Sequence, residues 1–348
     1  MNRWLWLCGL LILAGALWLR LPGLDRRPMH NDEAINASML QGLWERGTYR
    51  YDPHEYHGPS FYYAALPFLW LSRADNYDEV SEATLRLMPV FFGTALILLF
   101  WLMADGLGRA ATLWAGLLAA LSPAMVFYSR YFIHEMLLVC FTMMLVGFGW
   151  RYARTGCIGC AMLAGAGLGL MYATKETFVL NLFALGLASV VVWFLQGRSM
   201  GAEESAASNT AETVGRAVPA RRPCVGSPKA ARWDSAPHLA SGLCGLFHGL
   251  TSKLRPHLKP ALAGLAVAAV VSLLLFTSFF TNLAGPLDSI RAYLPWLHRA
   301  GGHSPHIHPW NFYLERLAFF HPARSPVWSE GLILVLAALL LSACAKTT

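Results

Sequence analysis

Apolar residues recur in long uninterrupted runs that short polar segments separate. At about 1.5 Å per residue, each interior run is long enough as a helix to cross most of a hydrocarbon core about 30 Å thick. We therefore predict an all-α, polytopic membrane helix bundle of about eight spans, the last one shortened. The predicted spans are 4–21, 85–103, 111–127, 132–150, 158–174, 178–195, 261–283 and 331–345.

One further apolar run, Pro59–Leu71, has only 13 residues and carries aromatic residues such as Tyr62 that suit a membrane interface. The positive-inside rule decides whether it crosses. If it does not cross, the basic residues Arg109 and Arg151 and the basic stretch 196–260 all lie in the cytoplasm. We therefore predict an interfacial helix within the first outer loop.

Composition agrees with a membrane protein. The chain is 56% hydrophobic and only 14% charged, and its mean hydropathy is +0.43. A soluble domain is roughly 45–50% apolar and about 25% charged, so the soluble class is excluded. The net charge of +7 follows from basic cytoplasmic loops in such a protein. We expect membrane lipids as partners and no nucleic acid.

Three parts are expected along the chain. Residues 1–195 form a transmembrane module whose first outer loop is 22–84. Residues 196–260 carry nine Lys and Arg against four acidic residues and little periodicity, which predicts a disordered cytoplasmic linker. Residues 261–348 add further spans and a His-rich outer loop, 284–330. Because the chain stops inside an apolar run, we expect the C-terminus to be incomplete.

Polar residues concentrate on one side of the predicted bundle. Nine of the twelve histidines fall in the three outer loops, which make up roughly a third of the chain. A structural protein does not need titratable groups on one face, whereas a catalytic or binding site at the membrane boundary does.

The first outer loop supplies a pair of acids, Asp32 and Glu33, just before a stretch with helical spacing. The two carboxylates either complement the helix dipole or face a site, where Asp32 would act as a base. Candidate loop and substrate contacts follow in the same loop: His30, His54, His57 and Tyr62.

Two charged positions lie at the outer ends of later spans. Glu135 begins a span, where a carboxylate is costly without a partner, so it either pairs with Arg130 or has a functional role. Lys175 lies in the turn between two spans. It either forms a snorkelling ion pair with Glu176 or offers a cation to a phosphate near the membrane surface.

The third outer loop places three histidines in six residues, beside a tryptophan. This pattern suggests a metal or hydrogen bonds to a polar ligand, although loop histidines beside Pro and Trp are also common structural residues. A divalent metal is therefore left open as a cofactor, with His57 as a further candidate ligand. The loop residues are His303, His306, His308 and Trp310.

The order of these motifs resembles a family. It comprises an outer-loop Asp-Glu, Gly-Pro-Ser-Phe-Tyr-Tyr, Arg-Leu-Met-Pro, Ser-Pro, Tyr-Ser-Arg and Thr-Lys-Glu. The chain resembles the GT-C membrane glycosyltransferases, near the protein O-mannosyltransferases and the lipid A aminoarabinose transferases. Its His-Asn-Asp-Glu-Ala, His-Gly-Pro and His-Pro-Trp pieces are most similar to a prokaryotic branch labelled flippase activity-associated or dolichyl-phosphate-mannose-protein mannosyltransferase-like.

The resemblance implies an inverting glycosyltransferase in the cell membrane, with its active site facing outside. It would move a sugar from a polyprenyl-phosphate donor to a protein, lipid or glycan acceptor. Asp32 would be the base with Glu33 beside it, Glu135 would match a second acidic position, and Lys175 or Arg130 would contact the donor phosphate. Members of the family are usually longer, and the segment 196–260 has no counterpart in the pattern.

Two other functions remain open. A flippase for lipid-linked sugars, or a flippase accessory protein, would lack transfer chemistry and would carry polar residues along its spans. A non-catalytic scaffold would keep the fold alone. The one-sided polar cluster favours the transferase over the flippase, and the Asp32-Glu33 pair argues against the scaffold.

Overall fold

The structure, a computed structural model, describes residues 3–54, 57–192, 239–300, 309, 311–319, 321 and 329–347. The chain divides into two compact units. The first comprises Met1–Val179 and Pro260–Ala345, and the second comprises Leu180–Lys259 and Lys346–Thr348. Every contact and site discussed below lies within the first unit.

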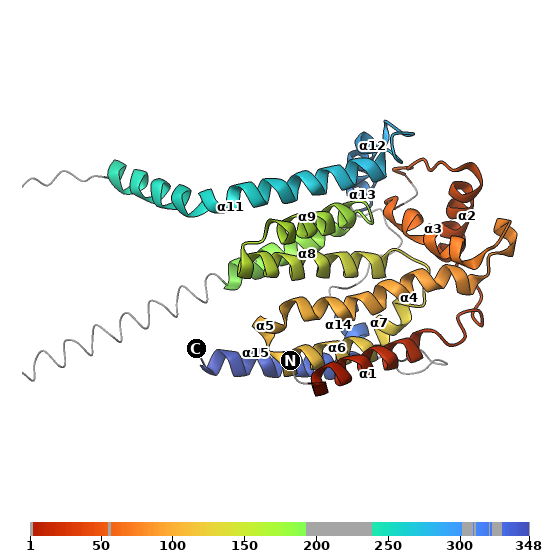
Figure 1. The fold of residues 1–348 in the computed structure, drawn as a ribbon, viewed down its shortest axis with the longest axis horizontal. Coiled ribbons are helices and arrows are strands. Elements are labelled where there is room, and N and C mark those ends of the chain that lie inside the picture. Colours follow the sequence, from red (N-terminus) through yellow and green to blue (C-terminus); the bar gives the residue numbers. More distant parts are fainter. Residues whose placement is uncertain are drawn as a thin grey trace, which may run out of the picture. The chain divides into compact units, whose positions relative to one another are not determined.

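All regular elements in the described residues are helices (Figure 1). The prediction of an all-α protein is therefore confirmed. The helices are α1 (Arg3–Arg20), α2 (Asn31–Arg46), α3 (Ser60–Ser72), α4 (Glu82–Leu99), α5 (Ala104–Leu107), α6 (Arg109–Leu121), α7 (Pro123–Tyr128), α8 (Glu135–Thr155), α9 (Ile158–Tyr172), α11 (Leu239–Phe276), α12 (Gly285–Arg291), α13 (Tyr293–Ala300), α14 (Phe312–Ala318) and α15 (Gly331–Thr347), with short 3₁₀ turns η1 (Tyr77–Glu79) and η2 (Phe100–Met103).

Four helical stretches among the described residues are long and apolar enough to cross a membrane: Arg3–Arg20, Glu82–Leu107, Glu135–Thr155 and Pro256–Phe276. Three shorter apolar helices cover Arg109–Leu121, Ile158–Tyr172 and Phe178–Val192. The protein is thus a helical membrane protein, while the count of about eight spans stays a prediction. Helix α3 forms where the interfacial helix was expected, and its position relative to the membrane also stays a prediction.

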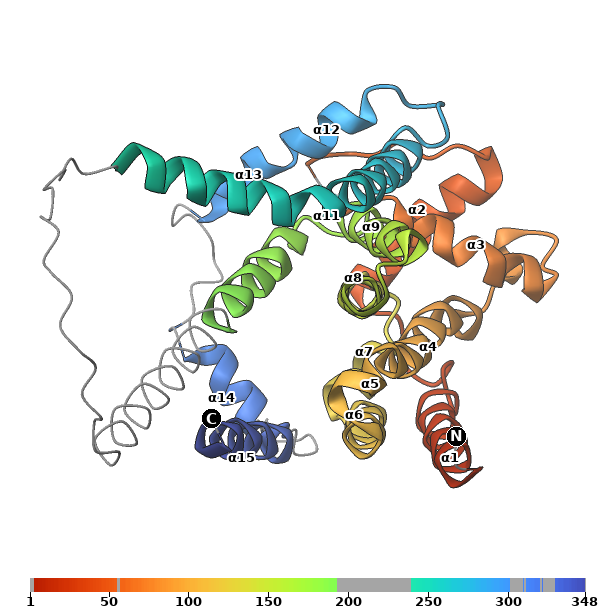
Figure 2. The ribbon, with the colours of Figure 1, turned by 60° about the vertical axis from the view of Figure 1, so that its left-hand side comes forward.

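Helix α8 lies at the centre of the first unit and packs against both α4 and α9, while α1 packs against α6 (Figure 2). Helix α9 also packs closely against the part of α11 after residue 260. A Cβ atom added at Gly165 would lie 2.0 Å from the Gly264 carbonyl oxygen, and one at Gly169 would lie 2.6 Å from that of Ala268. Small residues four apart allow this close approach of two membrane helices.

The predicted span 111–127 is wrong as a single helix. Ser122 has an extended backbone (φ −53°, ψ 123°) that separates α6 from α7, and Pro123 starts the new helix. The break leaves carbonyl groups at the end of α6 without helical partners. Buried Arg20 satisfies two of them, donating 2.9 Å to the Ala120 oxygen and 3.0 Å to the Ala119 oxygen.

Two other predicted boundaries differ. The span 261–283 ends early, because α11 stops at Phe276 and residues 278–280 have positive φ angles of 48°, 55° and 72°. Residues 239–260 of the segment expected to be a linker lie within α11, and the disordered linker over 196–260 stays a prediction. Residues 196–238 of that segment lie outside the described residues.

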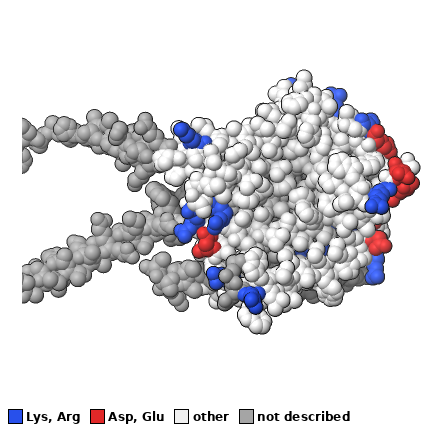
Figure 3. Space-filling model, in the orientation of Figure 1, with Lys and Arg blue, Asp and Glu red and all other residues white. Residues whose placement is uncertain are grey.

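Charged side chains on the face drawn in Figure 3 gather toward the ends of the helices and leave the area between them almost uncharged. Side chains such as Trp18, Phe91 and Leu180 are more than half exposed, as expected for helices that face lipid. The ends of α1, α7 and α9 and the starts of α4 and α8 lie at one end of the helices. The polar segments that were expected to build a site connect to these ends.

Candidate active site

The site begins with the first turn of α2. His30 precedes the helix and accepts a hydrogen bond from the Asp32 backbone N–H at 3.3 Å, while Glu33 accepts one from the His30 backbone at 3.1 Å. This reciprocal arrangement is a capping box, in which His30 stands where Ser or Thr is more common. Both acids lie in the first turn, as the helix-dipole interpretation expects.

Glu33 is fully buried, and both of its carboxylate oxygens are held. Arg86 donates to both oxygens at 2.9 Å, and the Phe132 backbone N–H donates at 2.9 Å. Burial alone would raise the pKa of Glu33, but these hydrogen bonds outweigh it and lower the pKa. Glu33 therefore joins α2 to α4 and to the Phe132 backbone just before α8, which is a structural role. Its predicted catalytic role stays a prediction.

A second junction holds the first outer loop against the turn after α9. The Gly58 N–H donates 3.0 Å to the Thr174 oxygen, and the Ser60 N–H donates 2.9 Å to the Ala173 oxygen. A Cβ atom on Gly58 would lie 2.1 Å from the Ala173 oxygen, so only glycine allows this approach. The His-Gly-Pro-Ser and Thr-Lys-Glu motifs thus form one contact that places residue 57 beside residues 175 and 176.

These junctions surround a cavity of about 210 Å³, which we call the Asp32 pocket. The predicted residues Asp32, His57, Glu135 and Lys175, from four separate segments, all contribute to its wall. Its lining residues are Asp32, Ile35, Asn36, His57, Ile133, His134, Glu135 and Lys175.

Opposite charges face each other in the Asp32 pocket. Lys175 Nζ lies 2.6 Å from Glu135 Oε1, and the Lys175 side chain is only 16% exposed. Both ion pairs considered from the sequence are therefore wrong: Glu135 is paired with Lys175 and not with Arg130, and Lys175 is not paired with Glu176. The Asp32 side chain is 61% exposed, so its carboxylate is accessible to a ligand.

A histidine–glutamate pair lies at the wall of the Asp32 pocket, beside the Lys175–Glu135 ion pair and Asp32. His57 Nδ1 lies 2.8 Å from Oε2 of buried Glu176, and the Tyr51 hydroxyl donates 3.2 Å to Oε1 of the same carboxylate. Burial alone would raise the pKa of Glu176, but the contact with His57 outweighs it and lowers the pKa. Glu176 thereby fixes the orientation of His57 at the pocket wall.

Two polar side chains complete the wall. His134 is buried and stacks on Phe61, with ring centres 4.2 Å apart. Burial, together with the nearby charges of His57 and Lys175, holds the pKa of His134 well below its ordinary value, so the ring is neutral. Its Nε2 has no hydrogen-bond partner in the described part of the chain. Asn36 donates 3.1 Å to the Phe132 oxygen.

Other predicted site residues lie elsewhere. Arg130 donates to the Leu19 and Pro22 carbonyl oxygens and lines a different cavity. Tyr62 is buried and donates 3.3 Å to Asn36, behind the pocket wall, while His54 is exposed. The remaining predictions, on His303, His306, His308 and Trp310, fall outside the described residues.

Metal ligation finds no support in the part of the chain that the structure describes. No group of three or more His, Cys, Asp or Glu side chains among those residues is placed to hold an ion. The metal prediction that included His57 together with the third loop stays a prediction.

Sequence reasoning missed three members of the site. Glu176 was considered only as a partner of Lys175, His134 was not assigned a role, and Asn36 was not singled out. The spacing of α2 could have identified Asn36, because positions 32, 35 and 36 share one side of a helix. Nothing local in the sequence connects Glu176 to His57, 119 residues away.

Residues 60–217 match the family model of dolichyl-phosphate-mannose-protein mannosyltransferases. This match, over somewhat less than half of the chain, agrees with the resemblance to mannosyltransferases recognised from the sequence. No curated protein sequence matches the chain.

Among solved structures, the chain is similar to the S. cerevisiae protein O-mannosyltransferase Pmt1-Pmt2 complex bound to the sugar donor, with a TM-score of 0.51 and 16% identity. The similarity covers 81% of this chain but 34% of that one, so this chain spans about a third of the relative's length. The structural similarity concerns the fold.

Proposed function

We propose that this protein is an integral-membrane glycosyltransferase that moves a sugar from a polyprenyl-phosphate donor to an acceptor at the extracytoplasmic face, with inversion at the anomeric carbon. The observation that carries the proposal is the Asp32 pocket. An exposed carboxylate, a cation and a glutamate-bound histidine converge there from separate segments of a mannosyltransferase-like fold.

Asp32 is the base in this mechanism. Its carboxylate takes the proton of the acceptor O–H group while the acceptor oxygen forms a bond to the anomeric carbon. The bond from that carbon to the phosphate oxygen breaks, and its electron pair stays on the phosphate. Because a phosphate leaves without being protonated, one base is sufficient and a second acidic group is not required.

Lys175 offsets the charge that develops on the departing phosphate. In the free protein its ammonium group is held by Glu135 at 2.6 Å. A donor phosphate would compete with Glu135 for this ammonium group, and Glu135 would keep the lysine charged and in place between turnovers. This arrangement makes Lys175 the preferred phosphate contact over Arg130, which does not line the same cavity.

The histidines bind and orient the sugar. Glu176 holds His57 through Nδ1, and the neutral ring of His134 has an unpartnered Nε2 among the described residues. A buried polar atom without a partner costs about 1–3 kcal/mol. A sugar hydroxyl group that donates to this nitrogen would remove that cost and align the anomeric carbon.

The decisive experiment compares transfer from radiolabelled polyprenyl-phosphate sugars by the wild-type protein and by Asp32→Asn, at matched membrane levels. Asn keeps the size and much of the hydrogen bonding but cannot accept the proton, so we expect turnover to fall roughly 10²- to 10⁴-fold. Asp25→Asn is the matched control, because Asp25 is exposed in the same loop and does not line the pocket. Near wild-type turnover of Asp32→Asn would remove Asp32 from the mechanism.

The same membranes separate the transferase from a flippase. A flippase would carry the labelled lipid to the opposite leaflet without releasing polyprenyl phosphate, and Asp32→Asn would not abolish that movement. Single-cysteine proteins test the orientation: a cysteine at exposed position 75 should react with a membrane-impermeant reagent on intact cells, whereas Cys157, exposed in the α8–α9 turn, should not. The reverse labelling pattern would overturn the assigned face.

A further inference from the structure

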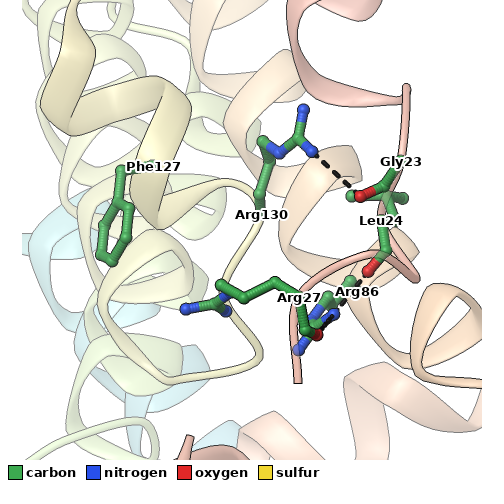
Figure 4. A pocket seen from close by; sticks show the side chains of 6 residues that line it. All are labelled: Gly23, Leu24, Arg27, Arg86, Phe127 and Arg130. Carbon is green, nitrogen blue, oxygen red and sulfur yellow. Dashed lines mark hydrogen bonds between the residues drawn. The ribbon is translucent and has the colours of Figure 1, made fainter. Parts of the chain in front are cut away.

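A second cavity lies at the same end of the helices and shares no lining residue with the Asp32 pocket. Its volume is about 120 Å³. Four water molecules occupy about this volume in the liquid, at about 30 Å³ each, so one phosphate group fits. Figure 4 shows three arginines that reach it from three segments of the chain. This arginine pocket is lined by Gly23, Leu24, Arg27, Arg86, Phe127 and Arg130.

The three guanidinium groups are engaged to different degrees. Arg86 is buried and holds Glu33 and the carbonyl oxygens of Leu24 and Arg27. Arg130 uses its two terminal nitrogens on carbonyl oxygens. Arg27, which is 42% exposed, donates only from Nη2, to Glu33, at 2.8 Å. The described residues supply no acceptor for the Nε and Nη1 groups of Arg27.

The charge around this cavity is not balanced at its wall. All three ionisable lining residues are cations. Glu33 is shared by Arg27 and Arg86, Glu82 is bound to Arg86, and the described residues give Arg130 no carboxylate partner. Burial and the positive charges of Arg27 and Arg86 lower the pKa of Arg130, which is the effect expected of like charges held together. An anion in the cavity would offset this repulsion.

The surroundings of the arginine pocket are those of a membrane surface. Arg130 contacts the last turn of α1 and the segment just after it, and α1 is one of the candidate spans. Beside these contacts, Trp18 and Leu21 are 74% and 42% exposed. A lipid could therefore lay its acyl chains along the outer face of α1 and its headgroup against the arginines.

We propose that the arginine pocket is a binding site for the phosphate group of an anionic lipid, distinct from the Asp32 pocket. Arg27 and Arg130 supply the donors, and their planar guanidinium groups suit phosphate oxygens. The phosphate could instead come from free phosphate in solution, and the experiment separates the two sources.

The test measures how fast phenylglyoxal modifies individual arginines of the wild-type protein in a phosphate-free sugar detergent. Separate samples receive short-chain phosphatidylglycerol, short-chain phosphatidylcholine or inorganic phosphate. With phosphatidylglycerol at ten times its dissociation constant, the modification of Arg27 and Arg130 should slow about tenfold. Arg26, an exposed neighbour that does not line the pocket, is the internal control and should not change.

Equal modification of Arg27 with and without phosphatidylglycerol would overturn the proposal, as would equal protection of Arg26. Protection by inorganic phosphate as strong as that by phosphatidylglycerol would overturn the lipid as the source while retaining the phosphate site. The double variant Arg27→Gln, Arg130→Gln should lose the lipid that native mass spectrometry detects on the wild type. The single variant Arg26→Gln should keep it. Arg27→Lys with Arg130→Lys, which keeps both charges, covers the case in which the first double variant does not fold.

Discussion

Asp32 and Glu33 are adjacent in the chain, yet they serve two regions that handle charge in different ways. Asp32 is 61% exposed and faces a cavity in which acids, a lysine and histidines are mixed. Glu33 is fully buried and neutralises Arg86 at the edge of a cavity whose ionisable lining is entirely cationic. In the proposed mechanism the first region moves a proton and releases a phosphate, whereas the second is proposed to hold an anion and has no carboxylate among its lining residues.

The two residues of the Asp-Glu motif therefore have separable tasks. Glu33 receives donors from α4, from the loop before α2 and from the Phe132 backbone, so it fixes the position of the helix turn on which Asp32 stands. A buried carboxylate that fixes its neighbour is a way to give an exposed base a constant position.

The largest effect should follow from removing the buried partner. Glu33→Ala leaves Arg86 buried without its main counter-charge, which costs about 3–5 kcal/mol. Asp32→Ala removes only a helix-dipole contact and should cost less than about 1 kcal/mol. The measurement is the midpoint of denaturant unfolding in detergent for both variants. If the two variants lost equal stability, the two tasks would not be separable.

A smaller effect is expected at the cation of the Asp32 pocket. Lys175→Ala removes the proposed phosphate contact and should lower kcat/KM for the donor roughly 10- to 100-fold, the range for one charge-assisted hydrogen bond. Lys175→Arg keeps the charge and should retain more activity than Lys175→Ala. Equal activity of the two variants would show that the positive charge at position 175 does not contribute to transfer.

The contact between the first outer loop and the turn after α9 can be disturbed without changing any charge. Gly58→Ala would place a Cβ atom 2.1 Å from the Ala173 oxygen, and overpacking of this kind costs about 1–3 kcal/mol. Gly15→Ala is the control, because nothing lies within 4 Å of a Cβ atom at that position. Both stability and transfer rate should fall for Gly58→Ala, and an unchanged transfer rate would separate this contact from the active site.

The smallest effect should be a pH dependence that arises from His134. The pKa of His134 in the folded protein lies below the ordinary value of about 6.5. As the pH falls, the unfolded chain therefore binds a proton at His134 before the folded protein does. The stability from the neutral ring is complete above about pH 6.5 and is lost as the pH falls toward the folded pKa, by at most about 1.4 kcal/mol per pH unit. In His134→Phe, the midpoint of denaturant unfolding should change less with pH over this range. The same slope in the variant would assign the pH dependence to another group.

Several features were predictable because they depend on local pattern or on the chemistry of single residues. The apolar runs indicated the helices of the bundle, and the helical spacing after Asp32 indicated α2. The break at Ser122 was not predicted, since the apolar run continues through it. It is stabilised by Arg20 from α1 and by Glu330, which accepts hydrogen bonds from Ser122 and from the Ala124 backbone.

The candidate site was partly predictable for a topological reason. The ends of antiparallel helices meet on one side of a bundle, so polar residues at those ends were expected to converge, as Asp32, His57, Glu135 and Lys175 do. Their pairing was not predictable. The sequence suggested that Lys175 binds its neighbour Glu176, but the turn after α9 directs Lys175 to Glu135 and Glu176 to His57.

By itself, the sequence determined the class of protein. A chain that is 56% hydrophobic and 14% charged belongs in a membrane, and its long apolar runs satisfy their backbone hydrogen bonds there as helices. It also determined which residue types are available for chemistry. Only the tertiary structure decided that Asp32 faces a cavity while Glu33 is buried, and that Arg130 lines a different pocket from Lys175. The physical reason is range: helix formation depends on neighbours in the chain, whereas the partner of a charge depends on which side chains packing brings within about 3–4 Å.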